Sequence, residues 1–248
     1  RVYKEGKYTT KEAAIIATGF STVSATFMII IAKTLDIMHL WNVYFWTTLV
    51  VTFIVTAITV RIPPLSRKPD TYVTEEGFPE PVYKEKMLER AWEDALEVSK
   101  SAPSIMKNIA VNLKDGFIMT MGILPSIMSV GLIGIVLAKF TPIFDWISYI
   151  FYPFTWLLQL PEADLAAKAA SVGIAEMFLP SLLVVSAPLV TKFVIAVVSV
   201  SSILFFSASI PCILSTDIPL KVSELIILYV QRTILTLLII TPIAYLLL

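Results

Sequence analysis

The sequence predicts an all-α, polytopic membrane protein with about five or six membrane segments. Three observations predict this class. Hydrophobic residues make up 57% of the chain and its mean hydropathy is +0.82, whereas soluble domains are nearer half apolar. Charged residues make up only 15%. Several apolar stretches have the length of a bilayer span, but glycine, proline or hydroxyl residues interrupt them, which is typical of broken or re-entrant helical hairpins.

The totals also exclude several functions. The charges balance, with 19 basic and 19 acidic residues, so nothing indicates a nucleic-acid partner. A single cysteine, Cys212, excludes an internal disulfide, and a single histidine, His39, excludes a multi-histidine metal cage. The chain has no Walker motif, GxGxxG, HExxH or GxSxG. We therefore expect no ATP hydrolysis, no cofactor, no resident metal and no enzyme activity.

The first expected segment, Ala13 to Ala32, has the length of a bilayer span, but its centre reads TGFSTVSAT. This centre carries Gly19 and five hydroxyl side chains: Thr18, Ser21, Thr22, Ser24 and Thr26. At about 100° per residue, all of the hydroxyls except Ser24 fall on one helical face. Two interpretations stay open. The face packs closely against a neighbouring helix, or it lines a path for a solute or ion, with the helix unwinding at Gly19.

A second segment is expected from about Trp41 to Val60, and it completes a first gate hairpin over residues 1–60. It opens with an aromatic cluster of the kind found at the level of the lipid headgroups. It ends before Pro63 and Pro64, because a proline cannot continue the helix.

The only long hydrophilic region covers residues 61–114 and holds nine basic and nine acidic residues. Its first half is a proline-rich loop. Its second half, from about Lys84 to Asn112, predicts an amphipathic helix on the membrane surface or on the protein, broken at Pro103. Because basic residues gather here and in the N-terminal residues before Ala13, both regions are expected on the cytoplasmic side.

Residues 115–248 are expected to form the second membrane half. Its elements, in chain order, are a span from about Gly116 to Ala138 interrupted at Gly122 and Pro125, an aromatic interfacial helix or short bent span from Ile143 to Leu160 split at Pro153, a gate hairpin over residues 171–210 made of segments 172–190 and 192–210, and a last span from about Val222 to Leu248.

The motif VGIAEMFLPS places a carboxylate, Glu176, inside an apolar segment. A carboxylate at that depth is costly unless it is paired or protonated. Gly173, Glu176 and Pro180 share one helical face, and Pro180 frees a backbone carbonyl one turn earlier, near Glu176. Two interpretations stay open: a proton or Na⁺ site beside a broken helix, or a structural hydrogen bond from Glu176 to a neighbouring helix.

Arg232 lies inside the last expected span. It reaches the membrane interface by snorkelling, or it faces inward. An inward guanidinium would pair with Glu176 or Glu224, or bind an anionic group of a substrate.

Three stretches, TTKEAAIIATGFSTVSATFMIIIAKTL, FWTTLVVTFIVTAITVRIPPLS and SVGIAEMFLPSLLV, resemble the YjiH-type membrane proteins. These belong to the GATE, or "nucleoside recognition", domain group, which is similar to the FeoB membrane gates, the sporulation maturation proteins A and B and the concentrative nucleoside transporters. The resemblance implies a bacterial inner-membrane protein whose broken hairpins meet near the bilayer midplane. The gate elements that it implies are Gly19, Ser21, Thr22 and Ser24 in the first motif and Gly173, Glu176, Pro180 and Ser181 in the second.

These observations together predict a membrane transporter, or a subunit of one, for a small polar solute, coupled to an H⁺ or Na⁺ gradient. The solute would bind between the two motifs, with Arg232 balancing charge. Five or six segments look like half of an inverted-repeat transporter, so we expect a second GATE chain, a homo-oligomer or a missing N-terminal half, surrounded by membrane lipid. The alternative is a structural or regulatory subunit that docks a partner membrane protein through residues 84–114.

Overall fold

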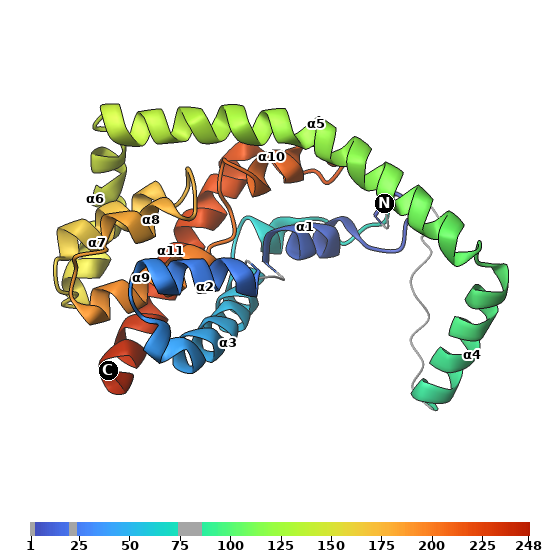
Figure 1. The fold of residues 1–248 in the computed structure, drawn as a ribbon, viewed down its shortest axis with the longest axis horizontal. Helices are drawn as coiled ribbons and strands as arrows, with labels where there is room; N and C mark the ends of the chain where they lie inside the picture. Colours follow the sequence, from blue (N-terminus) through green and yellow to red (C-terminus); the bar gives the residue numbers. More distant parts are fainter. Residues whose placement is uncertain (1–2, 20–23, 74–85) are drawn as a thin grey trace.

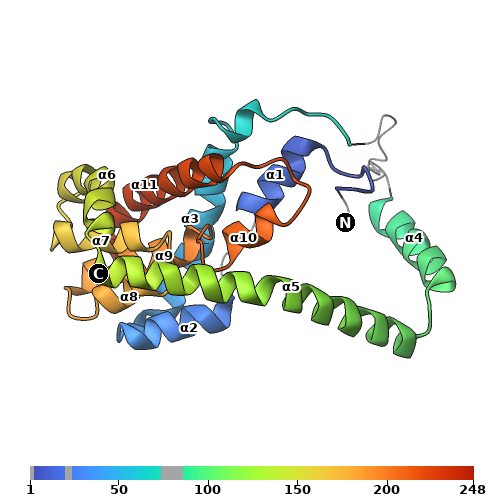
Figure 2. The ribbon, with the colours of Figure 1, turned by 90° about the horizontal axis from the view of Figure 1, so that it is seen from above.

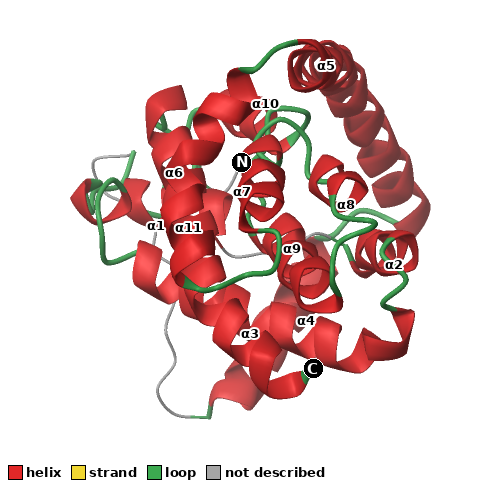
Figure 3. Cartoon of the chain, turned by 90° about the vertical axis from the view of Figure 1, so that its left-hand side faces the viewer, coloured by secondary structure: helices red, strands yellow, loops and turns green. Residues whose placement is uncertain are grey.

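A computed structural model of the protein describes residues 3–19, 24–73 and 86–248. Within these ranges every regular element is a helix, and Figure 3 shows only helices joined by loops. Two helical stretches are long and apolar enough to cross a membrane: Met38–Thr59, which contains helix α3, and α11 (Val222–Leu247). The prediction of an all-α chain is therefore confirmed for the described residues, and two helical stretches have the length and composition expected of a membrane span. The number of spans stays a prediction.

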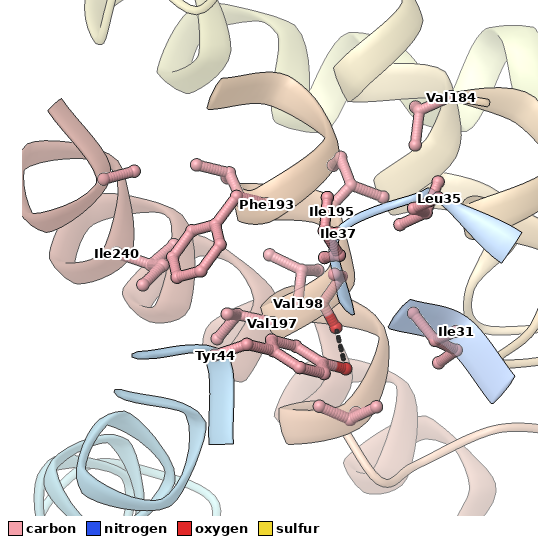
Figure 4. Close-up of a cluster of buried hydrophobic side chains, with 14 of the residues drawn as sticks. Ile31, Leu35, Ile37, Tyr44, Val184, Phe193, Ile195, Val197, Val198 and Ile240 are labelled. Carbon is pink, nitrogen blue, oxygen red and sulfur yellow. Dashed lines mark hydrogen bonds between the residues drawn. The ribbon is translucent and has the colours of Figure 1, made fainter. Parts of the chain in front are cut away.

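Three helices form the centre of the molecule: α3 (Trp41–Thr59), α9 (Leu189–Ser201) and α11. Each contacts the other two. From Phe193 to Ser201, every residue of α9 is buried, which is the pattern of a helix enclosed on all sides. Figure 4 shows how this core packs: Tyr44 of α3 donates a hydrogen bond to the carbonyl of Ala196 over 3.3 Å, and its ring meets Phe193 edge to face.

Helices α6 (Ile143–Leu157) and α7 (Ala163–Val172) form an antiparallel hairpin beside this core. Alanines make the buried face of α7, and small residues let helices approach closely. The prediction that Pro153 splits the aromatic stretch is wrong, because α6 continues through Pro153 to Leu157. A proline removes one intrahelical hydrogen bond, and here one further turn forms beyond it.

Two of the expected helix interruptions are present. The first segment consists of α1 (Thr10–Gly19) and α2 (Ala25–Thr34), and the Ser24 hydroxyl caps α2 by accepting from the Phe27 amide. The second motif is unwound between the end of α7 and the start of α8 (Leu179–Leu183). Pro180 therefore marks the start of a helix, as the sequence predicts, and the first segment is interrupted at Ser24, with residues 20–23 outside the described residues.

A third interruption was not expected. The segment 192–210 is not one helix, because α9 ends at Ser201 and α10 (Ser209–Leu214) begins after an unwound stretch. This stretch crosses the unwound part of the second motif. The Phe206 amide donates to the Ile174 carbonyl over 2.7 Å, and the Ser207 amide donates to the Ala175 carbonyl over 3.0 Å. Backbone amides of one unwound stretch thus satisfy backbone carbonyls of the other.

Helix α4 (Met87–Ser101) and the first half of α5 (Ile105–Phe140) extend away from the rest of the molecule (Figures 1 and 2). We call residues 87–121 the arm. Every side chain that the structure describes in the arm is exposed, so the expected amphipathic helix is present but does not lie on the described protein. The break at Pro103 is confirmed.

The interruption expected at Gly122 and Pro125 is wrong, because α5 runs continuously past both residues. The amphipathic segment after Pro103 and the apolar span after Gly116 are one helix and not two. At about 1.5 Å per residue, the 36 residues of α5 reach roughly 54 Å. Helix α5 contacts α6 and α10, and every described side chain in its N-terminal half is exposed.

Candidate functional site

The Arg232 side chain is the largest fully buried side chain of the described residues, with 1% of its surface exposed. It lies on α11, and its guanidinium points inward between α3 and α9. Its Nη1 donates to the Thr56 hydroxyl over 3.1 Å, and its Nη2 donates to the Ser201 carbonyl over 2.8 Å. Snorkelling to the interface is therefore the wrong interpretation of this residue.

Two helices end at this guanidinium. Ser201 is the last residue of α9, and Gly19 is the last residue of α1. The Thr56 hydroxyl connects Gly19 to the arginine, because it donates to the Gly19 carbonyl while accepting from Arg232. The carbonyl end of a helix carries partial negative charge, so both helix ends stabilise the buried cation.

The contact at Gly19 has no room for a side chain. A Cβ atom there would lie 2.8 Å from Cγ2 of Thr56 and 3.5 Å from Nη1 of Arg232. Local sequence explains the helix end, since glycine weakens a helix, but the close approach to α3 explains why no larger residue fits. Gly19 therefore stands in the site for a packing reason that the motif alone does not reveal.

The described part of the chain offers this charge no acidic partner. Among the residues that the structure describes, no carboxylate oxygen lies within 4.0 Å of the guanidinium. Glu224, one expected partner, pairs with Lys68 over 2.8 Å and caps α11 through the Lys221 amide. Glu176, the other, makes local backbone contacts described below. The Nε of Arg232 has no hydrogen-bond partner among the described residues.

Buried hydroxyl groups lie along α3, α9 and α11, the three helices that meet at the arginine, and we call this set the hydroxyl seam. Two close pairs cross between α9 and α11: Ser201 with Thr236 at 3.3 Å and Ser202 with Thr233 at 3.4 Å. The described members of the seam are Thr48, Thr52, Thr56, Thr59, Ser199, Ser201, Ser202, Thr233, Thr236 and Thr241. Sequence reasoning missed the seam, although threonine at every fourth position from Thr48 to Thr56 was a visible signal.

The described hydroxyls of the first motif that were expected on one face, Thr18 and Thr26, do not share it. Thr18 is buried on α1 and bonds to the Ala14 carbonyl of its own helix over 2.7 Å. Ser24 and Thr26 are exposed beside the start of α2. Because the helix is interrupted between them, a single helical period does not apply across the motif. Ser21 and Thr22 lie outside the described residues, so of this motif the structure brings only Gly19 to the guanidinium.

The second motif has a different arrangement. Glu176 is half-buried, and its Oε2 accepts hydrogen bonds from the amides of Phe178 at 2.8 Å and Leu179 at 3.2 Å. The carboxylate thereby caps the start of α8, and among the described residues it makes no hydrogen bond to a neighbouring helix. It also lines a shallow pocket of about 300 Å³ with Phe27 and Ile30 of α2. The second motif and the second half of the first segment therefore lie side by side.

Gly173 and its neighbours pack tightly behind this motif. A Cβ at Gly173 would lie 2.6 Å from the Tyr229 hydroxyl and 3.3 Å from Cγ of Pro180. Tyr229 donates to the Ala170 carbonyl, which anchors α11 to the end of α7. Ser181 is fully buried, and its hydroxyl has no partner among the described residues.

An apolar cavity of about 420 Å³ lies on the other side of the crossing of the two unwound stretches. Ile174, Ala175 and Phe206 come from the crossing itself, and the remaining lining residues come from α5, α6 and α11. Within the described ranges no group of three histidine, cysteine, aspartate or glutamate residues is placed to hold a metal ion.

Comparisons with known proteins give one relative and no assigned function. No family model matches the chain, and no solved structure matches it. The relative is an uncharacterized protein of the bacterium Alkalihalophilus pseudofirmus, 38% identical over 252 residues, which cover 98% of this chain and 53% of the relative. The chain thus spans about half the length of the curated relative that it matches. The described residues of this protein are thus helical, two of their helical stretches are long and apolar enough to cross a membrane, and the relative is bacterial.

Proposed function

We propose that the chain is a membrane transporter, or a subunit of one, for a small polar solute. One observation carries the proposal: a buried guanidinium donates to the carbonyl at the end of α9 and, through the Thr56 hydroxyl, is connected to the Gly19 carbonyl of α1. Ionisable groups inside helical membrane proteins mark solute and ion paths. Interrupted helices whose ends face a polar group are the usual construction of such sites in transporters.

The proposed roles divide between the two motifs. Gly19 and Arg232, with the hydroxyl seam, form the solute site. Glu176 carries the coupling H⁺ or Na⁺, since its carboxylate is half-buried beside α2 in a shallow pocket. The resemblance to YjiH-type GATE proteins of the bacterial inner membrane supports this assignment. A second half, supplied by another GATE chain, by a second copy or by further sequence, is proposed because the relative is about twice as long.

The test is flux into proteoliposomes that contain the full-length protein. Pools of labelled small polar metabolites are offered under an inward H⁺ gradient, an inward Na⁺ gradient and no gradient. We expect accumulation under one gradient, and Glu176→Gln removes the gradient dependence because the amide binds neither ion in the same way. Glu162→Gln, at an exposed carboxylate, is the matched control. Unchanged gradient dependence in Glu176→Gln contradicts the coupling role.

A second candidate function rests on the arm. Leu88, Trp92 and Leu96 stand four residues apart on α4, so they share a face, and each is exposed. Under this alternative the face docks an apolar helix of a partner membrane protein, and the chain moves no solute itself. Deleting residues 87–101 then abolishes the complex. If the chain transports alone, the same deletion leaves flux intact.

A further inference from the structure

We propose that the solute recognised at this site is an anion and that Arg232 binds its carboxylate or a similar oxyanion group. The inference rests on the proposed transport function and names its substrate class. It follows from the charge, the partners and the enclosure of one side chain.

The charge of Arg232 has no counter-charge beside it in the described core. Of the residues that the structure describes, it is the only charged one whose side chain is fully enclosed, and no carboxylate lies within 4.0 Å of it. A buried charge without a counter-ion strongly destabilises a fold unless hydrogen bonds compensate. An anionic solute at this position would supply the missing counter-charge.

The partners that the guanidinium has are neutral and incomplete. A guanidinium carries five N–H groups, and the described residues accept from it through the Thr56 hydroxyl and the Ser201 carbonyl. Its Nε has no partner among these residues. Nε and Nη2 lie on one edge of the planar group, and a carboxylate binds such an edge through two parallel hydrogen bonds. An oxyanion at this edge would add a bond to Nε and one to an N–H of Nη2, which carries two N–H groups.

Binding at this edge would connect recognition to the helix ends. In the structure Nη2 holds the carbonyl at the end of α9, directly before the unwound stretch that crosses the second motif. A solute bound at Nη2 therefore lies directly beside that carbonyl. Arg232 is also closed over by Gly19 and Thr56, so a solute reaches it only when a helix end moves. Recognition of the anion thus requires movement of a helix end at this site.

The experiment compares probes that differ only in charge. Purified full-length protein in lipid nanodiscs is titrated calorimetrically with three pairs: succinate and succinamide, glutamate and glutamine, lactate and lactamide. We expect at least one carboxylate to bind at least about tenfold more tightly than its amide, because a hydrogen bond to a charged group is the stronger one. Equal binding of carboxylate and amide in every pair overturns the inference.

Variants separate recognition from stability. Arg232→Lys keeps the charge but loses the paired geometry, so it lowers carboxylate affinity at least about tenfold, and Arg232→Met abolishes the preference for carboxylate. Arg67→Met, at an exposed arginine, is the control and leaves the preference for carboxylate over amide unchanged. If Arg232→Met does not fold, the comparison of carboxylates with amides in the wild type and the carboxylate affinity of Arg232→Lys still test the inference. Flux of neutral solutes alone overturns the anion inference and leaves the transport proposal intact, whereas no binding and no flux with any solute overturns both.

Discussion

At the scale of single residues, a missing methyl group decides how closely α1 approaches α3 and α11. An added Cβ at Gly19 would come within 2.8 Å of Thr56. Real Cβ atoms do not approach other carbons so closely, so either α1 or the Thr56 side chain has to shift. The shift would break the hydrogen bond from Thr56 to the Gly19 carbonyl and disturb the Arg232 contact that depends on the same hydroxyl.

Gly19→Ala is therefore expected to destabilise the protein by about 1–3 kcal/mol through overpacking. The measurement is thermal unfolding in detergent. Gly116→Ala is the matched control, because nothing lies within 4 Å of an added Cβ there. Within helix α5 this control should raise stability by up to about 1 kcal/mol, since alanine favours a helix. Equal effects at both glycines would contradict the close contact at Gly19.

Gly173 gives a second prediction with its own internal control. Its backbone φ is negative, so alanine is allowed there and the only severe clash is with the Tyr229 hydroxyl, 2.6 Å away. Gly173→Ala should destabilise by about 1–3 kcal/mol. In a Tyr229→Phe background the clashing oxygen is absent, so the same substitution should have a clearly smaller effect. A double-mutant cycle on unfolding free energies measures this coupling, and additive effects would rule the contact out.

At the scale of helices, the important features are the interruptions. The first two were predictable because glycine and hydroxyl residues mark one and Pro180 marks the other. The third, at residues 202–208, was not predictable, because SILFFSA is apolar and its amides bond to Ile174 and Ala175, far away in sequence. Conversely, the local sequence predicts helix breaks at Gly122, Pro125 and Pro153, but α5 and α6 continue through these residues.

The site residues also divide into those that local sequence predicts and those whose role depends on packing between distant helices. Arg232 and Gly19 were predicted as site residues from their type and position. Thr56 and Ser201 were not, because their roles exist only after α3 and α9 pack against α11. The one-face arrangement of Thr18 and Thr26 failed for a related reason, since a helical period holds only while the helix is continuous.

The start of α8 gives a prediction at this scale. Glu176 accepts hydrogen bonds from two backbone amides there. A glutamine at the same position also accepts them through its amide oxygen, whereas an alanine has no acceptor. Glu176→Ala should therefore destabilise by about 1 kcal/mol, the usual loss for an N-terminal cap, and Glu176→Gln by less. Unfolding free energies at constant pH give both values. If the two variants unfold alike, the cap contributes nothing and the carboxylate has another reason to be there.

At the scale of the whole molecule, the arm is too apolar to stay uncovered. All of its described side chains are exposed, including Trp92, Leu113 and Phe117. Contiguous apolar surface of this kind marks a contact with protein or membrane. The matched relative is about twice as long, so a second half is available in that protein to supply such a contact.

We accordingly expect native mass spectrometry of the 248-residue chain in nanodiscs to give an assembly of at least two chains, each of 27.5 kDa when homomeric. Replacing Leu88 and Trp92 by glutamate should return the mass to that of one chain, because charge on the docking face opposes association. These residues are exposed, so the thermal unfolding of the remaining helices should not change. A single-chain mass for the wild type would contradict the prediction.

The two backbone hydrogen bonds between the unwound stretches have a mechanical consequence. They tie the joint between α7 and α8 to the joint between α9 and α10 through main-chain atoms alone. Bending either joint by itself would strand two amides and two carbonyls, and each stranded group is strongly unfavourable away from water. Helices α7, α8, α9 and α10 are therefore expected to move together. Because main-chain atoms make the two hydrogen bonds, no side-chain substitution removes them directly.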